Sequence, residues 1–340
     1  MMAALAGCGQ KEQKKVSDYG FYLDTECTIT VYTDDEEKGR KIIKDAFALC
    51  EKYEGKMSKT VKGSDIYKLN HANGKAVSVS DSVREVLSMG IEMGKESKGR
   101  FDITVGRLTD IWDFKSDEPK VPRKSIIKAA MKTVDYENLV IEGSKVRLKR
   151  GDAEKGSEKN SGYNTAHVDL GGIAKGYISG KVAGYITKKG ITSGLINFGG
   201  NVITIGKKPD GSLWNVGIQD PNEEGASIVG STEAENQAVI TSGIYERKFE
   251  SGGKTYHHII DPRTGYPAET DVEGVTLTCP REKAGECDAY STICLLEGSS
   301  EGLEFIESKK DFEALFYCKD GSIKKTDGMD FKEAAEENGV

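Results

Sequence analysis

The chain has 340 residues and a net charge of −7, which leaves room for one large domain or two modest ones. No stretch approaches the roughly 18–20 apolar residues of a membrane-spanning helix, and the acidic balance argues against nucleic acid as the main partner. With 40 glycines against 7 prolines, the composition indicates many tight turns and close backbone approaches, as phosphate sites need.

The first residues resemble a processing signal. Leu5-Ala6-Gly7-Cys8 is similar to a bacterial lipobox, in which the cysteine is lipidated after cleavage, and the polar stretch that follows suits a tether. The segment before Cys8 is too short for a complete signal peptide, so an upstream start and a chance match both stay open. We expect residues 1–18 to be a truncated lipoprotein signal and tether. The protein would then be extracytoplasmic and lipid-anchored to the cell membrane through Cys8.

The first half of the chain alternates strand and helix signals. Residues 28–33 alternate like a strand, and Asp34 can cap a helix that runs to about Tyr53. Helical spacing predicts a second helix from Ser80 or Asp81 to about residue 96. Residues 151–167 are polar and glycine-rich, which is typical of a surface loop.

The second half is richer in strands. A helix over 173–189 should end at Gly190, and residues 222–237 look like a second loop insertion. Hairpins and short strands are predicted over 195–198, 202–205, 245–250, 254–260, 275–279, 312–318 and 322–325, with a helix over about 286–296. Because strands and helices mix without strict alternation, we expect one compact α+β unit.

The seven cysteines show no metal-binding spacing with one another or with the four His residues. They lie at positions 8, 27, 50, 279, 287, 294 and 318. Whether they pair cannot be deduced from spacing, and we interpret them mostly as core positions.

Residues 168–176 carry one candidate chemical site. A predicted strand runs through Asp169 into Gly171 and Gly172, and a helix containing Lys175 follows. This order aims backbone N–H groups and the helix dipole at an anion. The pattern is neither GxGxxG nor a P-loop. The alternative is that the glycines serve only strand–helix packing.

Two further segments combine acid, hydroxyl and imidazole groups. His258 stands three residues before an Asp-Pro-x-Thr-Gly turn, and its pKa range suits a base that takes a hydroxyl proton at neutral pH. Asp288 and Thr292 are i and i+4 on a predicted helix, so a carboxylate and a hydroxyl share one face. With a nearby carbonyl they suit Mg²⁺. A structural His, a helix cap and a buried Thr are the alternatives.

Taken together, these motifs resemble the ApbE family of FAD:protein FMN transferases over about residues 19–330. The matching segments, in chain order, are Leu23 to Thr25, Met57-Ser58, Ser64 to Asn70, Phe101 to Gly106 with Leu108 and Ile111 to Phe114, Asp169 to Gly176, Asn197 to Gly200, Thr241 to Arg247, His258 to Gly265, and Cys287 to Thr292.

The resemblance implies an α+β fold related to tunnelling-type folds, with mixed, mainly antiparallel sheets and flanking helices. It implies an enzyme that cleaves the FAD pyrophosphate and transfers FMN to a Thr or Ser hydroxyl of a target protein, releasing AMP. Residues 19–330 would form this domain and 331–340 a C-terminal tail.

The resemblance also assigns site residues. The main-chain carbonyl of Gly172, with Asp288 and Thr292, would hold Mg²⁺, and His258 would be the catalytic base. The residues expected to contact FAD are Leu23, Thr60, Arg100, Phe101, Asp102, Asp169, Lys175 and Ile260.

Two positions depart from the family pattern. Thr60 stands where an aromatic residue is common, so the flavin ring is expected to stack elsewhere, with Tyr53, Phe101 and Trp112 as candidates. Ile244 replaces a usually polar residue, which would alter the surroundings of the cation or phosphates.

Two other functions stay open. Water could replace the acceptor hydroxyl, which would make the protein a Mg²⁺-dependent FAD pyrophosphatase, or the chain could be a non-catalytic FAD-binding lipoprotein. The chain contains no Asp-x-x-Ser/Thr-Gly-Ala-Thr flavinylation sequence. The acceptor should therefore be another protein, such as a redox or electron-transfer subunit.

Overall fold

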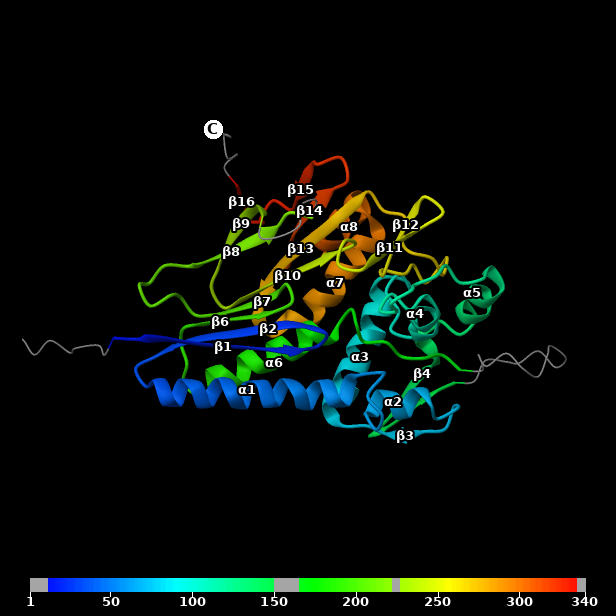
Figure 1. Cartoon of the computed structure of the whole chain (residues 1–340), viewed down its shortest axis with the longest axis horizontal. Helices are drawn as coiled ribbons and strands as arrows, with labels where there is room; N and C mark the ends of the chain where they lie inside the picture. Colours follow the sequence, from blue (N-terminus) through cyan, green and yellow to red (C-terminus); the bar gives the residue numbers. More distant parts are fainter. Residues whose placement is uncertain (1–11, 150–164, 222–226, 335–340) are drawn as a thin grey trace, which may run out of the picture.

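The computed structural model describes residues 12–149, 165–221 and 227–334. Its centre is an eight-stranded sheet with the order β1-β2-β6-β7-β10-β13-β14-β15, which crosses the molecule in Figure 1. Neighbouring strands of the described sheets pair antiparallel, and a single bridge between Val105 and His167 is parallel. The predicted α+β class with mainly antiparallel sheets is confirmed.

The elements have the following bounds. The central sheet consists of β1 (Lys14–Tyr22), β2 (Thr25–Thr33), β6 (Gly194–Phe198), β7 (Asn201–Ile205), β10 (Gln237–Gly243), β13 (Val272–Pro280), β14 (Glu313–Cys318) and β15 (Ile323–Lys325). The smaller sheets are β8 (Trp214–Gln219), β9 (Ile228–Ala234) and β16 (Lys332–Glu333); β3 (Val77–Ser78), β4 (Leu139–Glu142) and β5 (Lys145–Leu148); and β11 (Lys248–Ser251) with β12 (Lys254–His257). The helices are α1 (Glu36–Met57), α2 (Asp65–Asn70), α3 (Asp81–Glu96), α4 (Gly106–Trp112), α5 (Lys124–Met131), α6 (Ala174–Lys188), α7 (Ala284–Glu297) and α8 (Ser299–Glu307), with 3-10 turns at Tyr136–Asn138 and Arg281–Lys283.

Both faces of the central sheet are covered, and the period-two alternation of its strands decides which side chain meets which layer. On β2, Ile29 and Val31 are buried in the main core, on the face of the sheet that α1 covers. Tyr32 points to the opposite face and packs against Trp214 of β8. The site described below lies where α6 and α7 cross the main-core face.

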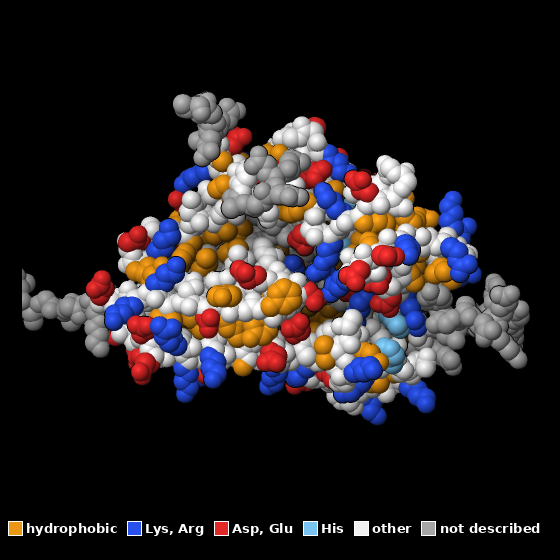
Figure 2. All heavy atoms as spheres, viewed as in Figure 1, with side chains coloured by type: hydrophobic (Ala, Val, Ile, Leu, Met, Phe, Trp, Pro, Cys, Tyr) orange, Lys and Arg blue, Asp and Glu red, His pale blue; other side chains and the backbone are white. Residues whose placement is uncertain are grey.

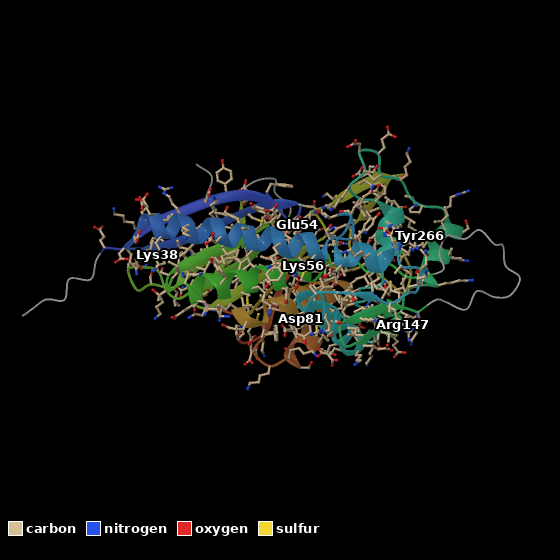
Figure 3. The ribbon with its side chains drawn as sticks, turned by 90° about the horizontal axis from the view of Figure 1, so that it is seen from below. Lys38, Glu54, Lys56, Asp81, Arg147 and Tyr266 are labelled. Carbon is tan, nitrogen blue, oxygen red and sulfur yellow. The ribbon has the colours of Figure 1, made fainter. Side chains whose placement is uncertain are left out.

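Helix α1 begins one residue later and ends later than the sequence predicts. The cap is Asp35, not Asp34, because Asp35 is extended and its carboxylate accepts a hydrogen bond from the N–H of Lys38. The helix continues to Met57, which is still buried in the core. Seen from below, α1 runs along the underside from Lys38 to Lys56 (Figure 3). Helix α3 begins at Asp81 and ends at Glu96, as predicted.

Three boundary predictions need correction. Lys14 to Asp18, assigned to the tether, belong to β1, because β1 pairs along its length with β2 and Val16 is buried. Lys332 and Glu333, assigned to the tail, pair with β9 as β16. The predicted insertion over 222–237 contains β9 itself, whose Ala234 packs against Trp214.

The cysteine interpretation is confirmed where the structure describes it. All six cysteines from Cys27 to Cys318 are buried and unpaired, whereas Cys8 and most of the predicted 151–167 loop lie outside the described residues. Among those residues no helix is long and apolar enough to cross a membrane.

Candidate functional site

The site is built around Asp288, whose side chain points from α7 toward the start of α6. One carboxylate oxygen accepts a 2.9 Å hydrogen bond from the backbone N–H of Gly176. Helices α6 and α7 approach each other so closely that a Cβ on Gly176 would lie 2.1 Å from the carbonyl oxygen of Ala284. Only glycine fits at this crossing, and the absence of a side chain is what brings the Gly176 N–H to the carboxylate.

The second carboxylate oxygen of Asp288 accepts a 3.2 Å hydrogen bond from the side-chain amide of Asn201 on β7. Burial raises the pKa of Asp288, while the charge of Lys175 and the hydrogen bonds from Gly176 and Asn201 oppose that rise. No described Lys or Arg forms an ion pair with this carboxylate. A buried acid with neutral donors on both oxygens is a place where an added cation gains free energy.

The other two predicted metal ligands lie beside it. Thr292 follows Asp288 by one helical turn, and a Cβ built on Gly172 would lie 3.3 Å from the Thr292 hydroxyl oxygen. The described residues contain no group of three or more His, Cys, Asp or Glu that could share a metal. A cation here would therefore depend on Asp288 together with hydroxyl and carbonyl oxygens, the donors that Mg²⁺ prefers. The residues present fit that ion.

The glycine turn before α6 works differently from its sequence prediction. The N–H of Gly171 donates to Asp169 at 2.8 Å, and the N–H groups of Ile173 and Ala174 donate to the carbonyl of Leu170. Together with Gly176, which donates to Asp288, these N–H groups have partners inside the protein. The positive end of α6 therefore faces the Asp288 carboxylate.

Lys175 carries a positive charge near both the Asp288 carboxylate and the imidazole of His258. Its ammonium donates weakly to the carbonyl of Gly199, at 3.4 Å, and its charge acts on both Asp288 and His258. Burial, followed by the charge of Arg247, lowers the pKa of His258 to about 4. The imidazole is therefore neutral at pH 7, and its buried Nδ1 has no partner among the described residues. The imidazole is thus in the unprotonated form that a base requires.

Charged side chains of both signs gather on the face seen in Figure 2, between the central sheet and the lobe that carries α4, α5 and the β11–β12 hairpin. The model of the ApbE family matches residues 23–316. The chain belongs to the ApbE family.

Relatives and solved structures agree with that assignment. FAD:protein FMN transferases of Klebsiella pneumoniae and Treponema pallidum are each 28% identical to this chain; the first match covers 87% of this chain and 86% of the relative, the second 97% and 92%. The crystal structure of the ApbE protein from Thermotoga maritima has a TM-score of 0.81 at 28% identity, covering 92% of this chain and 97% of that one. The Vibrio cholerae flavin transferase ApbE has a TM-score of 0.76 at 25% identity over the same shares.

Within this ApbE fold, the carboxylate of Asp169 is neutralised by the side chain of Lys59. Its carboxylate accepts from the ammonium of Lys59 at 2.9 Å, from the hydroxyl of Thr109 at 2.6 Å and from Gly171. Lys59 also pairs at 2.7 Å with Asp110. Burial raises the pKa of Asp169, but the Lys59 charge and these hydrogen bonds outweigh burial and lower it to about 2. Asp169 is therefore a fixed anion that anchors the turn before α6.

Arg100 and Asp102 also turn their side chains inward. The Arg100 guanidinium is buried and bonds to Asp261 at 2.5 Å, to Glu297 at 3.1 Å and to the carbonyl of Leu296. It thereby fastens the His258 segment to the end of α7. Asp102 accepts from the N–H and hydroxyl of Thr104 and from the N–H of Tyr136. Burial raises the pKa of Asp102 to about 6, against these bonds. Neither charged group is left free for FAD.

The remaining predicted FAD contacts divide between surface and core. Leu23 forms the β1–β2 turn at φ 55° and donates its N–H to Glu54, near the end of α1 in Figure 3. Thr60 is exposed, in the loop after α1. Phe101 is buried against the open side of Gly172, and Ile260 is buried in an aromatic cluster with Trp112.

The flavin-stacking prediction is wrong for Trp112. Its ring is fully buried among Phe114, Tyr256 and Tyr266, and its indole N–H donates to the carbonyl of Gly265. A flavin would find no free ring face there. The rings of Tyr53 and Tyr177 contact edge to face, with an interplanar angle of 85°, and the surface of Tyr53 is only partly buried.

Sequence analysis missed Asn201 and Lys59. Asn201 immediately follows the Asn197 to Gly200 motif, and Lys59 immediately follows Met57-Ser58. Their positions next to these motifs were the only signal in the sequence that could have identified them as site residues. It could not show which carboxylate each side chain would reach.

Proposed function

We propose that this chain transfers the FMN part of FAD to a Thr or Ser hydroxyl of a target protein and releases AMP, with Mg²⁺ held by Asp288, Thr292 and the carbonyl of Gly172. The relatives named FAD:protein FMN transferase support the transfer reaction. One observation carries the cation assignment, which is that Asp288 is buried with neutral donors on both oxygens and no ion pair in the described chain.

The residues divide the work as follows. A cation bound at Asp288 supplies charge neutralisation of the FAD pyrophosphate and of the charge that develops during phosphoryl transfer. Lys175 adds a second positive charge beside the same carboxylate. Because the N–H groups of Gly171, Ile173, Ala174 and Gly176 are used inside the protein, we assign phosphate binding to these charges and not to the helix N-terminus.

His258 is the base in this proposal. Its neutral imidazole takes the proton of the acceptor hydroxyl as the hydroxyl oxygen bonds to the FMN phosphorus. The bond between that phosphorus and the bridging oxygen breaks, and the oxygen leaves on AMP. Arg100 keeps the His258 segment fixed relative to α7 through Asp261 and Glu297.

The test uses the purified chain with FAD and Mg²⁺, with and without a protein that displays an Asp-x-x-Ser/Thr-Gly-Ala-Thr segment. We expect an FMN-sized mass gain on the acceptor together with AMP, and loss of both in His258→Asn. AMP and free FMN without acceptor labelling would instead establish the pyrophosphatase. FAD binding with no AMP would leave the non-catalytic binding protein.

We also propose that the protein is extracytoplasmic and lipid-anchored through Cys8, with a redox or electron-transfer subunit at the same membrane face as acceptor. The lipobox-like Leu5-Ala6-Gly7-Cys8 supports this, although Cys8 lies outside the described residues. Metabolic labelling with an alkyne fatty acid in a bacterial host should mark the wild-type chain and not Cys8→Ala. Equal labelling of both would contradict the anchor.

A further inference from the structure

Asn201 is the first residue of β7 and lies beside Asp288 of the candidate cation site. It follows the Gly199-Gly200 turn, pairs with Ile240 of β10 and is completely buried. Its side-chain amide donates to one oxygen of Asp288, while Gly176 donates to the other. The carboxylate is thus held from two sides by neutral donors that come from different layers of the fold.

The amide carbonyl of Asn201 has no partner. Its Oδ1 is one of the buried side-chain polar atoms without a hydrogen bond in the described structure; the others are Ser193 Oγ, His257 Nδ1 and His258 Nδ1. Leaving a buried acceptor unpaired costs on the order of 1–3 kcal/mol. Such an atom generally meets a water or an ion.

The orientation of this amide is fixed by its neighbour. If the amide were rotated by 180°, its oxygen would face the Asp288 carboxylate, and two acceptors would repel. Because Nδ2 and Oδ1 share one carbon, the unpaired carbonyl lies in the same small region as the carboxylate that Nδ2 contacts. The unpaired Oδ1 therefore lies close to the candidate cation site.

We propose that Asn201 is a positioning residue of the cation site: its amide N–H₂ holds Asp288 in the ligating orientation, and its Oδ1 accepts a hydrogen bond from a water molecule bound to the ion. This inference rests on the Mg²⁺ site of the proposed function. It adds a residue, outside the expected ligand set of Gly172, Asp288 and Thr292, that tunes the ion through its hydration shell.

The test measures ion binding without FAD or acceptor. Calorimetry with Mg²⁺ or Mn²⁺, and the rise in melting temperature on adding Mg²⁺, are compared for the wild-type full chain and Asn201→Leu. We expect about 10–100-fold weaker binding in the variant, the range for loss of a residue that orients a ligand. The control is Ser193→Ala, which also removes a buried, unpartnered polar atom and should bind the ion as wild type does.

The outcomes separate this inference from the proposed function. Wild-type affinity in a folded Asn201→Leu chain would overturn the role of Asn201 while leaving the cation site in place. No ion binding by the wild-type chain would instead remove the cation site, and with it the Mg²⁺ part of the proposed function.

If Asn201→Leu does not fold, Asn201→Ala removes the same amide with a smaller side chain, and the same loss of about 10–100-fold in Mg²⁺ affinity is expected. Wild-type affinity in Asn201→Ala would likewise overturn the inference.

Discussion

Asp169 begins the glycine-rich segment before α6, and Asp288 of α7 contacts the other end of that segment; the two carboxylates differ in the groups that surround them. Asp169, at the entrance of the turn, is paired with the ammonium of Lys59. Asp288 meets the far side of the turn through Gly176 and has only neutral donors in contact. The pKa of Asp169 is lowered to about 2, whereas burial raises that of Asp288.

This difference distinguishes a structural carboxylate, Asp169, from a candidate metal ligand, Asp288. A carboxylate that has its own lysine gains little from a second cation, because its charge is already compensated. A buried carboxylate without one gains most from an external ion. This comparison, and not the similar glycine-rich surroundings, indicates that Asp169 fixes the turn, and it supports the proposed cation binding at Asp288.

The largest expected effect is in Asp288→Asn. The amide keeps the shape but removes the charge, so we expect AMP release to fall by at least about 100-fold, since a metal ion contributes several kcal/mol to phosphoryl transfer. Chromatographic measurement of AMP with saturating FAD and Mg²⁺ checks this. Activity within tenfold of wild type would assign the cation elsewhere.

Lys59→Met tests the other side of the comparison. It leaves the carboxylates of Asp169 and Asp110 without their shared ammonium. We expect the free energy of unfolding to fall by about 2–3 kcal/mol. This is less than the full cost of breaking a buried pair, because the side chain of Lys59 is partly exposed. Urea denaturation measures it. The control Lys115→Met removes an exposed pair with Asp24 and should cost less than about 1 kcal/mol. A tenfold loss of Mg²⁺ affinity in Lys59→Met without loss of stability would reverse the two roles.

The stability of Asp169→Asn relative to wild type should depend on pH, because the charge of Asp169 stabilises the fold. The pKa of Asp169 is about 2 in the folded chain and close to 3.8 when unfolded, so its charge stabilises the fold above pH 4 and that contribution is lost as pH falls toward 2. We expect Asp169→Asn to be less stable than wild type by about 2 kcal/mol at pH 7, with the gap closing in acid. Denaturation curves at several pH values would contradict this if the gap were constant.

Thr292 should show the smallest effect. Thr292→Val removes one neutral oxygen ligand but keeps the shape, and we expect about tenfold weaker Mg²⁺ binding, equivalent to about 1.4 kcal/mol. Thr292→Ser keeps the hydroxyl and should bind within about twofold of wild type. Calorimetry compares the three chains. If Thr292→Val binds Mg²⁺ as tightly as wild type, the Thr292 hydroxyl oxygen is not a ligand.

Local signals in the sequence predicted much of the framework. The spacing of apolar residues located α3 from Asp81 to Glu96, and Gly190, with φ 90°, marks the end of the helical run that began at Ala174. The i, i+4 spacing of Asp288 and Thr292 already placed them on one helix face. Such features depend on residues within one or two turns, so they can be identified before any tertiary contact is known.

Long-range contacts decided the rest. Asn201 reaches Asp288 across 87 positions, Lys59 reaches Asp110 across 51, and Arg100 reaches Asp261 across 161. Residues 14–18 become a strand because β2 pairs with them, and Trp112 is buried because a distant hairpin covers it.

The sequence by itself thus determined which residue types carry the chemistry and that they belong to an α+β chain of the ApbE family. Only the tertiary structure decided which carboxylate is neutralised by a lysine and which has only neutral donors in contact. The physical reason is that a charge is set by the groups packed around it, and those groups are brought together by folding, not by spacing along the chain.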